Sequence, residues 1–471
     1  MESPGLFAVV ALFVVVVAAA ASDGDDAQLL EQFKEAVPSQ APDLRGWKAS
    51  DGACRFPGAG CRGGRLTSLS LAAVPLNADF RAVAATLLQL SSLETLSLRG
   101  TNVSGALAAA PRCGAKLQSL DLSANAGLRG SVSDVEALVA ACAGLSALNL
   151  SGGSVGGPRS AGAVASSGFG RLDALDLSDN KISGDGDLRW MVGAGVGAVR
   201  QLDLSGNKIS SLPEFTNCSG LEYLDLSGNL IAGEVAGRTL ADCRGLRTLN
   251  LSGNHLVGPF PPDVAALTAL TALNLSNNNF SSELPADAYT ELRQLKVLSL
   301  SFNHFNGTIP NSLAALPELD VLDLSSNTFS GTIPSSICQG PNSSLRMLYL
   351  QNNYLSGAIP ESISNCTRLE SLDLSLNNIN GTLPASLGKL GELRDLILWQ
   401  NFLEGEIPAS LENLDKLEHL ILDYNGLTGS IPPELSKCKE LNWISLASNQ
   451  LSGPIPAWLG QLSNLAILKL S

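Results

Sequence analysis

The sequence is poor in aromatic residues and in basic residues. The first shortage limits the kind of core the chain can form, and the second limits its binding partners. Aromatic side chains make up 5% of the 471 residues against an apolar share of 45%, so the core has to be mainly aliphatic. Lysine and arginine number 30 against 44 aspartates and glutamates, a formal net charge of −14. Because polyanions are repelled by such a chain at long range, we expect no nucleic acid partner.

Histidines and catalytic motifs are scarce as well. His255, His304 and His419 lie far apart, with no cysteine at metal-ligand spacing, so we expect no metal site and no cofactor. The chain contains no glycine-rich loop on a strand, no H-R-D and no D-F-G, so it lacks the protein-kinase signature. Acidic residues such as Asp176 and Asp203 recur at one position of a repeat, which argues against a catalytic pair. We predict that this chain is not an enzyme.

Long apolar runs are absent after the N-terminus. Residues 6–21 are all apolar and end in Ala19-Ala20-Ala21, a small-residue cleavage context, although residues 1–5 contain Glu2 and no lysine or arginine. We predict a signal peptide at residues 1–21 and entry into the secretory pathway, with an uncleaved anchor as the alternative. No later run approaches the roughly 20 residues of a membrane helix, so we expect membrane attachment only through a segment beyond Ser471.

A repeated unit, L-x-x-L-x-L-x-x-N, dominates the rest of the chain. Its last four steps, from Asn353 to Asn449, are 24 residues each. Counting L-x-L triplets from Leu69 to Leu470 gives 17 units, the last of them truncated, over residues 65–471. The unit's asparagine recurs at Asn102, Asn125, Asn180, Asn207, Asn229, Asn254, Asn278, Asn303, Asn327, Asn353, Asn377, Asn401, Asn425 and Asn449.

Each triplet predicts a short strand. In Leu322-Asp323-Leu324 the two leucines point inward and the aspartate faces solvent, because side chains alternate along a strand. Stacked strands form a parallel sheet on the concave face of an α/β solenoid, and the stability is a sum over neighbouring units. The asparagine amide is expected to bond backbone groups of its own loop and of the adjacent coil.

A Gly-x-Ile-Pro string follows the asparagine in many units, as in Gly307-Thr308-Ile309-Pro310 and Gly405-Glu406-Ile407-Pro408. This unit resembles the plant-specific class of leucine-rich repeats, found in receptor-like kinases, receptor-like proteins and polygalacturonase inhibitors. The resemblance implies a second short strand beside the first and a superhelical solenoid. Residues 22–64, with helical apolar spacing at 25–37 and a small cysteine loop, resemble the N-terminal cap of that class.

Nine cysteines and a signal peptide suggest an oxidising compartment. Cys218 and Cys243 both lie six residues before the first leucine of their triplets, so their Cα atoms are expected about 5 Å apart on adjacent coils. The spacing suits four candidate pairs, with buried free thiols as the alternative for the inter-coil pairs: Cys54 with Cys61, Cys113 with Cys142, Cys218 with Cys243, and Cys338 with Cys366. Cys438 is left over.

Ten N-x-S/T sequons mark candidate glycosylation sites, of which we expect about half to be used. They are Asn102, Asn149, Asn217, Asn250, Asn274, Asn279, Asn306, Asn342, Asn365 and Asn380. Glycans at the mid-triplet residues Asn149, Asn250 and Asn274 would cover part of the concave face. Because no sequon follows Asn380, we expect ligand contact toward the C-terminal coils.

Apolar and aromatic residues interrupt the polar concave pattern of the later coils. These possible contact residues are Tyr349, Ile397, Trp399, Ile421 and Tyr424, with ordinary variation between repeats as the alternative.

Longer strings resemble one receptor family. They include Ser301-Phe-Asn-His-Phe-Asn-Gly307, Leu396-Ile-Leu-Trp-Gln-Asn401 and Asn442-Trp-Ile-Ser-Leu446, which are similar to the brassinosteroid receptor kinases. That resemblance implies the extracellular face of the plasma membrane, a steroid hormone bound between late repeats and an island domain, and a co-receptor kinase as partner. It also implies a membrane helix and a Ser/Thr kinase that uses ATP and a divalent metal. Island, membrane helix and kinase segments are absent from residues 1–471.

Two other functions stay open. One is a repeat receptor for a peptide or another ligand, which a full-length product without an island between late repeats would favour. The other is a secreted inhibitor of a cell-wall-degrading enzyme, similar to polygalacturonase inhibitors. The 17 units count against the inhibitor, because that family usually has fewer.

Overall fold

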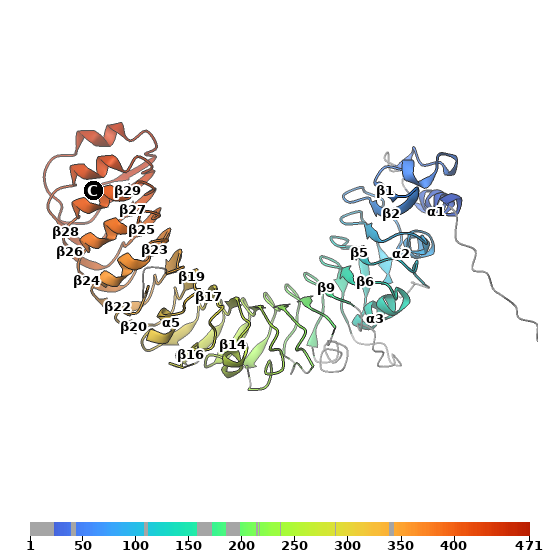
Figure 1. Cartoon of the computed structure of the whole chain (residues 1–471), viewed down its shortest axis with the longest axis horizontal. Helices are drawn as coiled ribbons and strands as arrows, with labels where there is room; N and C mark the ends of the chain where they lie inside the picture. The colour runs from blue at the N-terminus through green and yellow to red at the C-terminus, as the bar shows by residue number, and fades with distance from the viewer. Residues whose placement is uncertain are drawn as a thin grey trace, which may run out of the picture.

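The computed structural model describes residues 23–38, 44–107, 112–157, 172–184, 198–212, 215, 217–235, 237–287, 289–338 and 343–471. These residues form a single curved solenoid, drawn as a U in Figure 1, with the concave strands lining its inner side. The predicted signal peptide and Asn342 lie outside the described residues.

One sheet of 18 strands lines the concave side. Its first strand, β1, is antiparallel to β2, and every later strand is parallel to its neighbour in chain order. The strands are β1 Ala59–Arg62, β2 Arg65–Ser70, β3 Thr95–Ser97, β5 Ser119–Asp121, β7 Ala147–Asn149, β9 Ala174–Asp176, β10 Gln201–Asp203, β11 Tyr223–Asp225, β13 Thr248–Asn250, β15 Ala272–Asn274, β17 Val297–Ser299, β19 Val321–Asp323, β21 Met347–Tyr349, β23 Ser371–Asp373, β25 Asp395–Ile397, β27 His419–Ile421, β29 Trp443–Ser445 and β30 Ile467–Lys469.

A second set of short strands runs beside this sheet and confirms the plant-type architecture. They form ladders of three, four and five strands. Their bounds are β4 Gly105–Ala106, β6 Leu128–Gly130 and β8 Ser154–Val155; β12 Ala232–Glu234, β14 His255–Gly258, β16 Asn279–Glu283 and β18 His304–Asn306; and β20 Ser330–Gly331, β22 Tyr354–Gly357, β24 Asn378–Thr382, β26 Phe402–Glu406 and β28 Gly426–Thr428.

Short helices complete the coils. The α-helices are α1 Asp23–Ala36, α2 Phe80–Ala85, α3 Val132–Ala141 and α5 Asn311–Ala314. The 3-10 helices are η2 Ala49–Asp51, η3 Ala53–Arg55, η4 Leu87–Gln89, η6 Pro262–Ala266, η7 Glu361–Asn365, η8 Ala385–Lys389, η9 Ala409–Asn413, η10 Pro433–Lys437 and η11 Ala457–Gln461. Most Gly-x-Ile-Pro strings end in a proline that directly precedes a short helix, as Pro408 precedes η9, whereas Pro334 precedes a turn. Proline suits this place because its fixed φ matches a helix start and the N–H it lacks has no partner there.

The core is a stack of leucines inside the coil. Leu396 and Leu398 of one coil and Leu420 and Leu422 of the next are 0% exposed, and the same holds along most of the array. Each buried leucine contributes roughly 2 kcal/mol by removal from water. Phe280, Phe305 and Phe329 add a stack of rings beneath the second strands, with centroid spacings of 5.9 and 6.4 Å.

The recurring asparagine joins each coil to the one before it. The amide of Asn377 donates to the carbonyl oxygens of Leu350 at 2.9 Å and Leu374 at 3.1 Å, and its Oδ1 accepts from the backbone N–H of Leu355 at 3.0 Å. The bond to Oδ1 satisfies the buried N–H of Leu355, and each of the two carbonyls accepts a second amide bond from Asn353 or Asn401 on an adjacent coil.

The pattern repeats at Asn207, Asn254 and Asn303, which confirms the predicted role of the asparagine in those coils. The prediction was wrong at Asn102, which is exposed with a left-handed φ of 57°, because Thr101 occupies the buried place and donates to the carbonyl of Leu98.

A helical cap closes the N-terminal end. Leu30 and Phe33 of α1 are 0% exposed, and Trp47 stacks on Phe56 with ring centroids 5.1 Å apart. A disulfide between Cys54 and Cys61 holds the loop that carries β1. The cap therefore covers leucines of the first coil that would otherwise face water.

Alternating charges line the edge at which the concave strands begin. Arg200 lies 3.3 Å from Asp173 and 3.5 Å from Glu222, and a second run joins Asp320, Arg346 and Glu370. These side chains are partly exposed, so each pair adds little to stability. Their alternation keeps like charges apart on a sheet whose neighbouring strands are parallel and in register.

Candidate functional site

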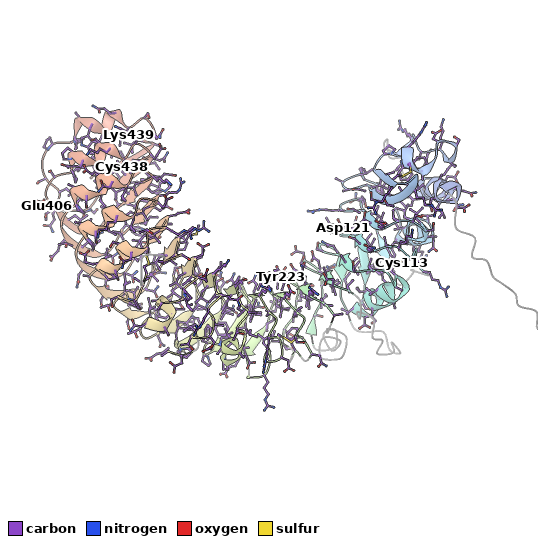
Figure 2. All side chains as sticks on the ribbon, in the orientation of Figure 1. Cys113, Asp121, Tyr223, Glu406, Cys438 and Lys439 are labelled. Atoms are coloured by element: carbon purple, nitrogen blue, oxygen red, sulfur yellow. A yellow bond between two sulfur atoms is a disulfide. The ribbon has the colours of Figure 1, made fainter. Side chains whose placement is uncertain are left out.

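The concave face presents one side chain per coil from the residue after the buried central leucine. We call this series the central row; Figure 2 labels one member, Asp121, on the inner side of the U. Its members from β5 to β29 are Asp121, Asn149, Asp176, Asp203, Asp225, Asn250, Asn274, Ser299, Asp323, Tyr349, Asp373, Ile397, Ile421 and Ser445. The row is acidic or amidic in its N-terminal part and mainly apolar or aromatic in its C-terminal part.

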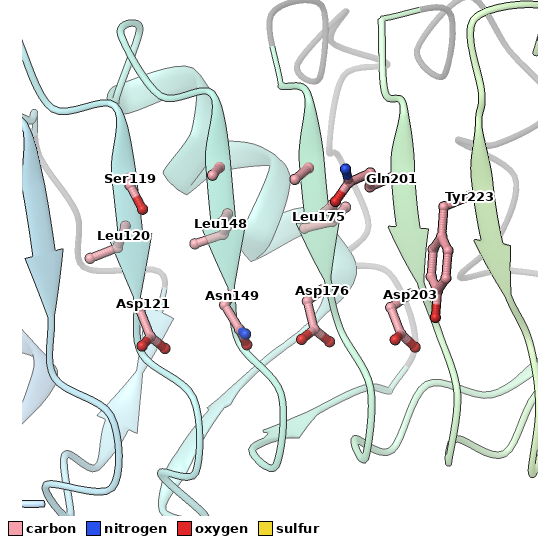
Figure 3. A pocket seen from close by; sticks show the side chains of 12 residues that line it. Ser119, Leu120, Asp121, Leu148, Asn149, Leu175, Asp176, Gln201, Asp203 and Tyr223 are labelled. Carbon is pink, nitrogen blue, oxygen red and sulfur yellow. The ribbon is translucent and has the colours of Figure 1, made fainter. Parts of the chain in front are cut away.

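A shallow hollow lies in the N-terminal part, over β5 to β11 (Figure 3). Its volume is about 360 Å³. Ala147 and Ala174 stand on adjacent strands directly before the central leucine, whereas the neighbouring coils carry Ser119 and Gln201 at that position. The two small side chains leave space between larger neighbours, and Tyr223 closes the far rim.

The carboxylates of the hollow are held by hydrogen bonds within their own coils. The backbone N–H and the hydroxyl of Ser205 donate to Oδ1 of Asp203 at 2.9 and 2.7 Å, and Ser178 does the same for Asp176. Tyr223 donates its hydroxyl to Oδ2 of Asp225 at 3.2 Å. The serines are thus committed as donors, and no histidine lines the hollow to activate one as a nucleophile.

Burial and like charge act together at this acidic row. Burial raises the pKa of Asp203, the bonds from Ser205 oppose that rise, and Asp225 and Asp176 add to it by repulsion. Burial also raises the pKa of Tyr223, with further increases from Asp225 and Asp203. The hollow therefore disfavours further negative charge.

The C-terminal part of the concave face has a different surface. Tyr349, Ile397 and Ile421 occupy the central row on β21, β25 and β27, and Trp399 takes the position two residues later where most coils have serine. We call these four residues the C-terminal contact stretch. Ile421 is 9% exposed, and the other three are partly exposed. They are the predicted contact residues that the structure does bring to one face.

Tyr424, the fifth predicted contact residue, lies elsewhere. It follows the strand, directly before Asn425, in the left-handed backbone region with φ of 53°. That conformation turns the chain away from the sheet, so Tyr424 lies on the lateral edge beside Phe402, with 60% of its surface exposed. The prediction placed it on the concave face because it counted residues from the strand without allowing for this turn.

Sequence reasoning missed two aromatic neighbours of the contact stretch. Trp443 and His419 lie directly before the central apolar residue of β29 and β27, and their rings meet edge to face at 6.2 Å. Nδ1 of His419 lies 2.6 Å from Oδ1 of Asp395, and Nζ of Lys469 lies 5.7 Å from the centre of the Trp443 ring. A comparison across coils of the residue directly before the central leucine or isoleucine would have identified Trp443 and His419.

The cysteine pairs occupy the places that the spacing predicted. Disulfides join Cys54 to Cys61, Cys113 to Cys142, Cys218 to Cys243 and Cys338 to Cys366. The Cα atoms of Cys218 and Cys243 are 4.6 Å apart. Cys438 is free and buried; burial raises its pKa to about 11, so its thiol stays protonated near neutral pH.

The sequons divide by exposure. Asn102, Asn217, Asn279, Asn306, Asn365 and Asn380 are exposed. The mid-triplet residues Asn149, Asn250 and Asn274 are half-buried, and each Oδ1 accepts a bond from the serine two residues later. Nδ2 of Asn250 also donates to Asp225 at 2.8 Å. Their amides are therefore part of the concave hydrogen-bond network.

Two further observations concern the described residues alone. Within them, no group of three or more histidine, cysteine or acidic side chains is arranged to hold a metal ion. No helix in the same ranges is long and apolar enough to cross a membrane.

Comparison with known proteins places the repeat architecture in a family. A family described as "Leucine-rich repeat region" matches residues 287–471, and "Leucine rich repeat" families match 170–231, 197–256 and 269–288. The chain is a leucine-rich-repeat protein. Over 267 residues this leucine-rich-repeat chain is 72% identical to the brassinosteroid LRR receptor kinase BRI1 of Oryza sativa, which confirms the predicted resemblance. The match covers 56% of this chain and 24% of that relative, so it spans about a quarter of the relative's length.

Solved structures show the same solenoid. The ectodomain of the Arabidopsis receptor kinase HAESA, in complex with an N-terminally extended IDA peptide hormone, is 27% identical with a TM-score of 0.54. That similarity covers 95% of this leucine-rich-repeat chain and 89% of the HAESA chain. HAESA with the peptide and the co-receptor SERK1 gives 26% identity and a TM-score of 0.50, with 95% and 93% covered.

Proposed function

We propose that the chain forms the N-terminal part of the ligand-recognising ectodomain of a brassinosteroid receptor kinase, on the extracellular face of the plasma membrane. The observation that carries this proposal is the 72% identity to a brassinosteroid receptor kinase over 267 residues. The four disulfides suit an oxidising extracellular compartment. Steroid hormone and co-receptor kinase are the partners of the whole receptor, and ATP with its divalent metal belongs to a kinase segment outside residues 1–471.

Within this function, the C-terminal contact stretch is the surface that meets a protein partner. Ile397 and Trp399 lie on one coil and Ile421 lies on the next. Tyr349 lies two coils before Ile397, with Asp373 between them. Aromatic and aliphatic groups of this kind form the centres of binding interfaces. The N-terminal hollow is less suited to this, because its carboxylates are already bonded to serines and would lose water on contact.

Extension of the transcript beyond the codon for Ser471 tests the proposed receptor. Further repeats, a non-repeat insertion, an apolar span and a kinase in the same reading frame support it. A stop directly after Ser471 in every transcript contradicts it. A functional test replaces the corresponding segment of the rice receptor with this chain; hormone-dependent association with the co-receptor should then persist.

A second candidate is a receptor for a peptide. The similarity to HAESA, which was solved with a peptide hormone, covers 95% of this chain and favours this candidate over the inhibitor. The same transcript separates the two receptors, because a steroid receptor of this kind has an island between late repeats and the peptide candidate lacks one.

A further inference from the structure

On the lateral edge of the C-terminal coils, β24, β26 and β28 run side by side (Figure 1). Two exposed aromatic side chains, Phe402 and Tyr424, line one hollow there. Phe402 is 65% exposed and Tyr424 is 60% exposed. The hollow has a volume of about 620 Å³, and its other lining residues include Thr382, Glu404 and Gln450 and no lysine or arginine. Exposed rings of this size cost free energy in water, which calls for something that covers them.

A sequon lies on the strand next to Phe402. In the pairing of β24 with β26, Asn380 is opposite Phe402 and Thr382 is opposite Glu404. Ile379 and Leu383, on either side of the Asn380–Thr382 segment, are 1% and 4% exposed, so Asn380 and Thr382 point outward. Opposite residues of neighbouring parallel strands lie on one face about 4.8 Å apart. The amide of Asn380 therefore projects beside the ring of Phe402.

The chain contains a second sequon of identical sequence without the aromatic neighbours. Asn306-Gly307-Thr308 matches Asn380-Gly381-Thr382, and both glycines have left-handed φ, 72° and 75°. At the positions of Phe402 and Tyr424, the coils beside Asn306 carry Thr328 and Asn352. Both asparagines are exposed, and on the following coils they differ in the aromatic rings. On the preceding strand Asn306 also lies opposite Glu283, which is why the comparison includes substitutions beside both sequons.

We propose that Asn380 carries an N-linked glycan whose first sugars pack on Phe402 and Tyr424. In the transfer, C1 of the first sugar bonds to Nδ2 of Asn380 in place of one amide hydrogen, and the diphosphate lipid carrier of the oligosaccharide donor leaves with that proton. The apolar C–H face of a pyranose covers an aromatic ring, while Gln450 and Glu404 offer hydrogen-bond groups to its hydroxyls.

The occupant is the chain's own glycan because it is tethered one strand away. A free ligand would lose translational and rotational freedom on binding, whereas a sugar attached to Asn380 has already lost most of it. The lining has no cation to attract a charged partner. The proposal rests on passage through the secretory pathway, which belongs to the function proposed above.

The test uses the secreted full chain from plant cells, with glycopeptide mapping followed by enzymatic release of glycans from the folded protein. The Asn380 glycan should be released about fivefold more slowly than the Asn306 glycan, because ring contact shields its first sugars. Phe402→Thr should remove that difference, and the reciprocal Thr328→Phe should slow release at Asn306. Tyr424→Ala should give a partial loss.

The outcomes separate the two proposals. Occupied Asn380 with equal release rates at both sites in all variants overturns the glycan contact, as does a glycan on Asn306 with none on Asn380. A secreted chain without glycan at any sequon overturns the contact alone, whereas a chain that stays in the cytosol without glycan contradicts the proposed extracellular route. Thr382→Ala abolishes the sequon while it retains Asn380 and Phe402, so it reports the melting temperature without the glycan.

Discussion

The N-terminal and C-terminal parts of the concave face share one backbone and differ in what they present. At the central row, Asp176 and Asp203 of the first part and Ile397 and Ile421 of the second occupy equivalent places on equivalent strands. The buried leucines beside them are alike, with exposures of 0 or 1%. The scaffold is therefore insensitive to the outward residue, and the outward residue is where recognition can differ along the arc.

The largest loss of stability is expected from substitution of the recurring asparagine, which both parts of the solenoid share. Asn207→Ala and Asn377→Ala should each destabilise the solenoid by about 2–4 kcal/mol, because each leaves one buried N–H without a partner and removes one of the two amide donors from each of two buried carbonyls. Denaturant unfolding combined with hydrogen exchange of the neighbouring coils measures this. Asn378→Ala, an exposed neighbour, serves as the control and should be close to neutral. A large loss in only one part would show that the scaffold is not uniform.

The second largest effect is on co-receptor binding, and it should differ between the N-terminal and C-terminal parts of the concave face. Ile397→Asp should weaken co-receptor association of the rice receptor that carries this chain by about tenfold or more, because a charge is placed in an apolar contact. A pull-down titration of the co-receptor ectodomain measures the apparent Kd.

The matched change for that experiment is Asp176→Ile in the N-terminal part, which should leave the Kd within about threefold. Equal losses for both variants, or a loss for Asp176→Ile alone, would contradict the assignment of the contact surface to the C-terminal coils.

The repeat explains why much of the fold could be predicted. In the concave sheet, paired residues are repeat equivalents: Asp373 is opposite Ile397, 397 − 373 = 24 residues later, the length of one unit. Counting along the sequence therefore finds true neighbours. The same offset argument placed Cys218 and Cys243 next to each other, and their Cα atoms are 4.6 Å apart.

The second strands follow a different register, which is why the lateral edge could not be predicted. Asn380 is opposite Phe402, and 402 − 380 = 22 residues, two fewer than the repeat. Neighbours on this edge are therefore not repeat equivalents, and alignment of the units conceals the pair. The N-terminal hollow was missed for another reason: it depends on two small residues, Ala147 and Ala174, at a position that the leucine pattern leaves unspecified.

The smallest predicted change in stability concerns the acidic N-terminal part of the central row. Burial and repulsion raise the pKa of Asp203 above its usual 3.8, so the folded state binds this proton more tightly than the unfolded state. As the pH rises from 3.8 through the pKa of Asp203 in the folded state, the folded protein loses stability relative to the unfolded chain. Above that pKa the loss of stability is constant. Asp203→Asn should remove this loss and raise stability at pH 7 by roughly 0.5 kcal/mol.

The chain itself shows that asparagine fits this place. Oδ1 of Asn149 accepts from the N–H and the hydroxyl of Ser151 at 2.9 and 2.8 Å, as Asp203 does from Ser205. Thermal unfolding at pH 7 and at pH 4 should therefore show a gain for Asp203→Asn that shrinks toward acid. The reverse change, Asn149→Asp, adds a charge between Asp121 and Asp176 and should lower stability at pH 7. If both variants melt like the parent at both pH values, repulsion along this row is too weak to distinguish it from the C-terminal stretch.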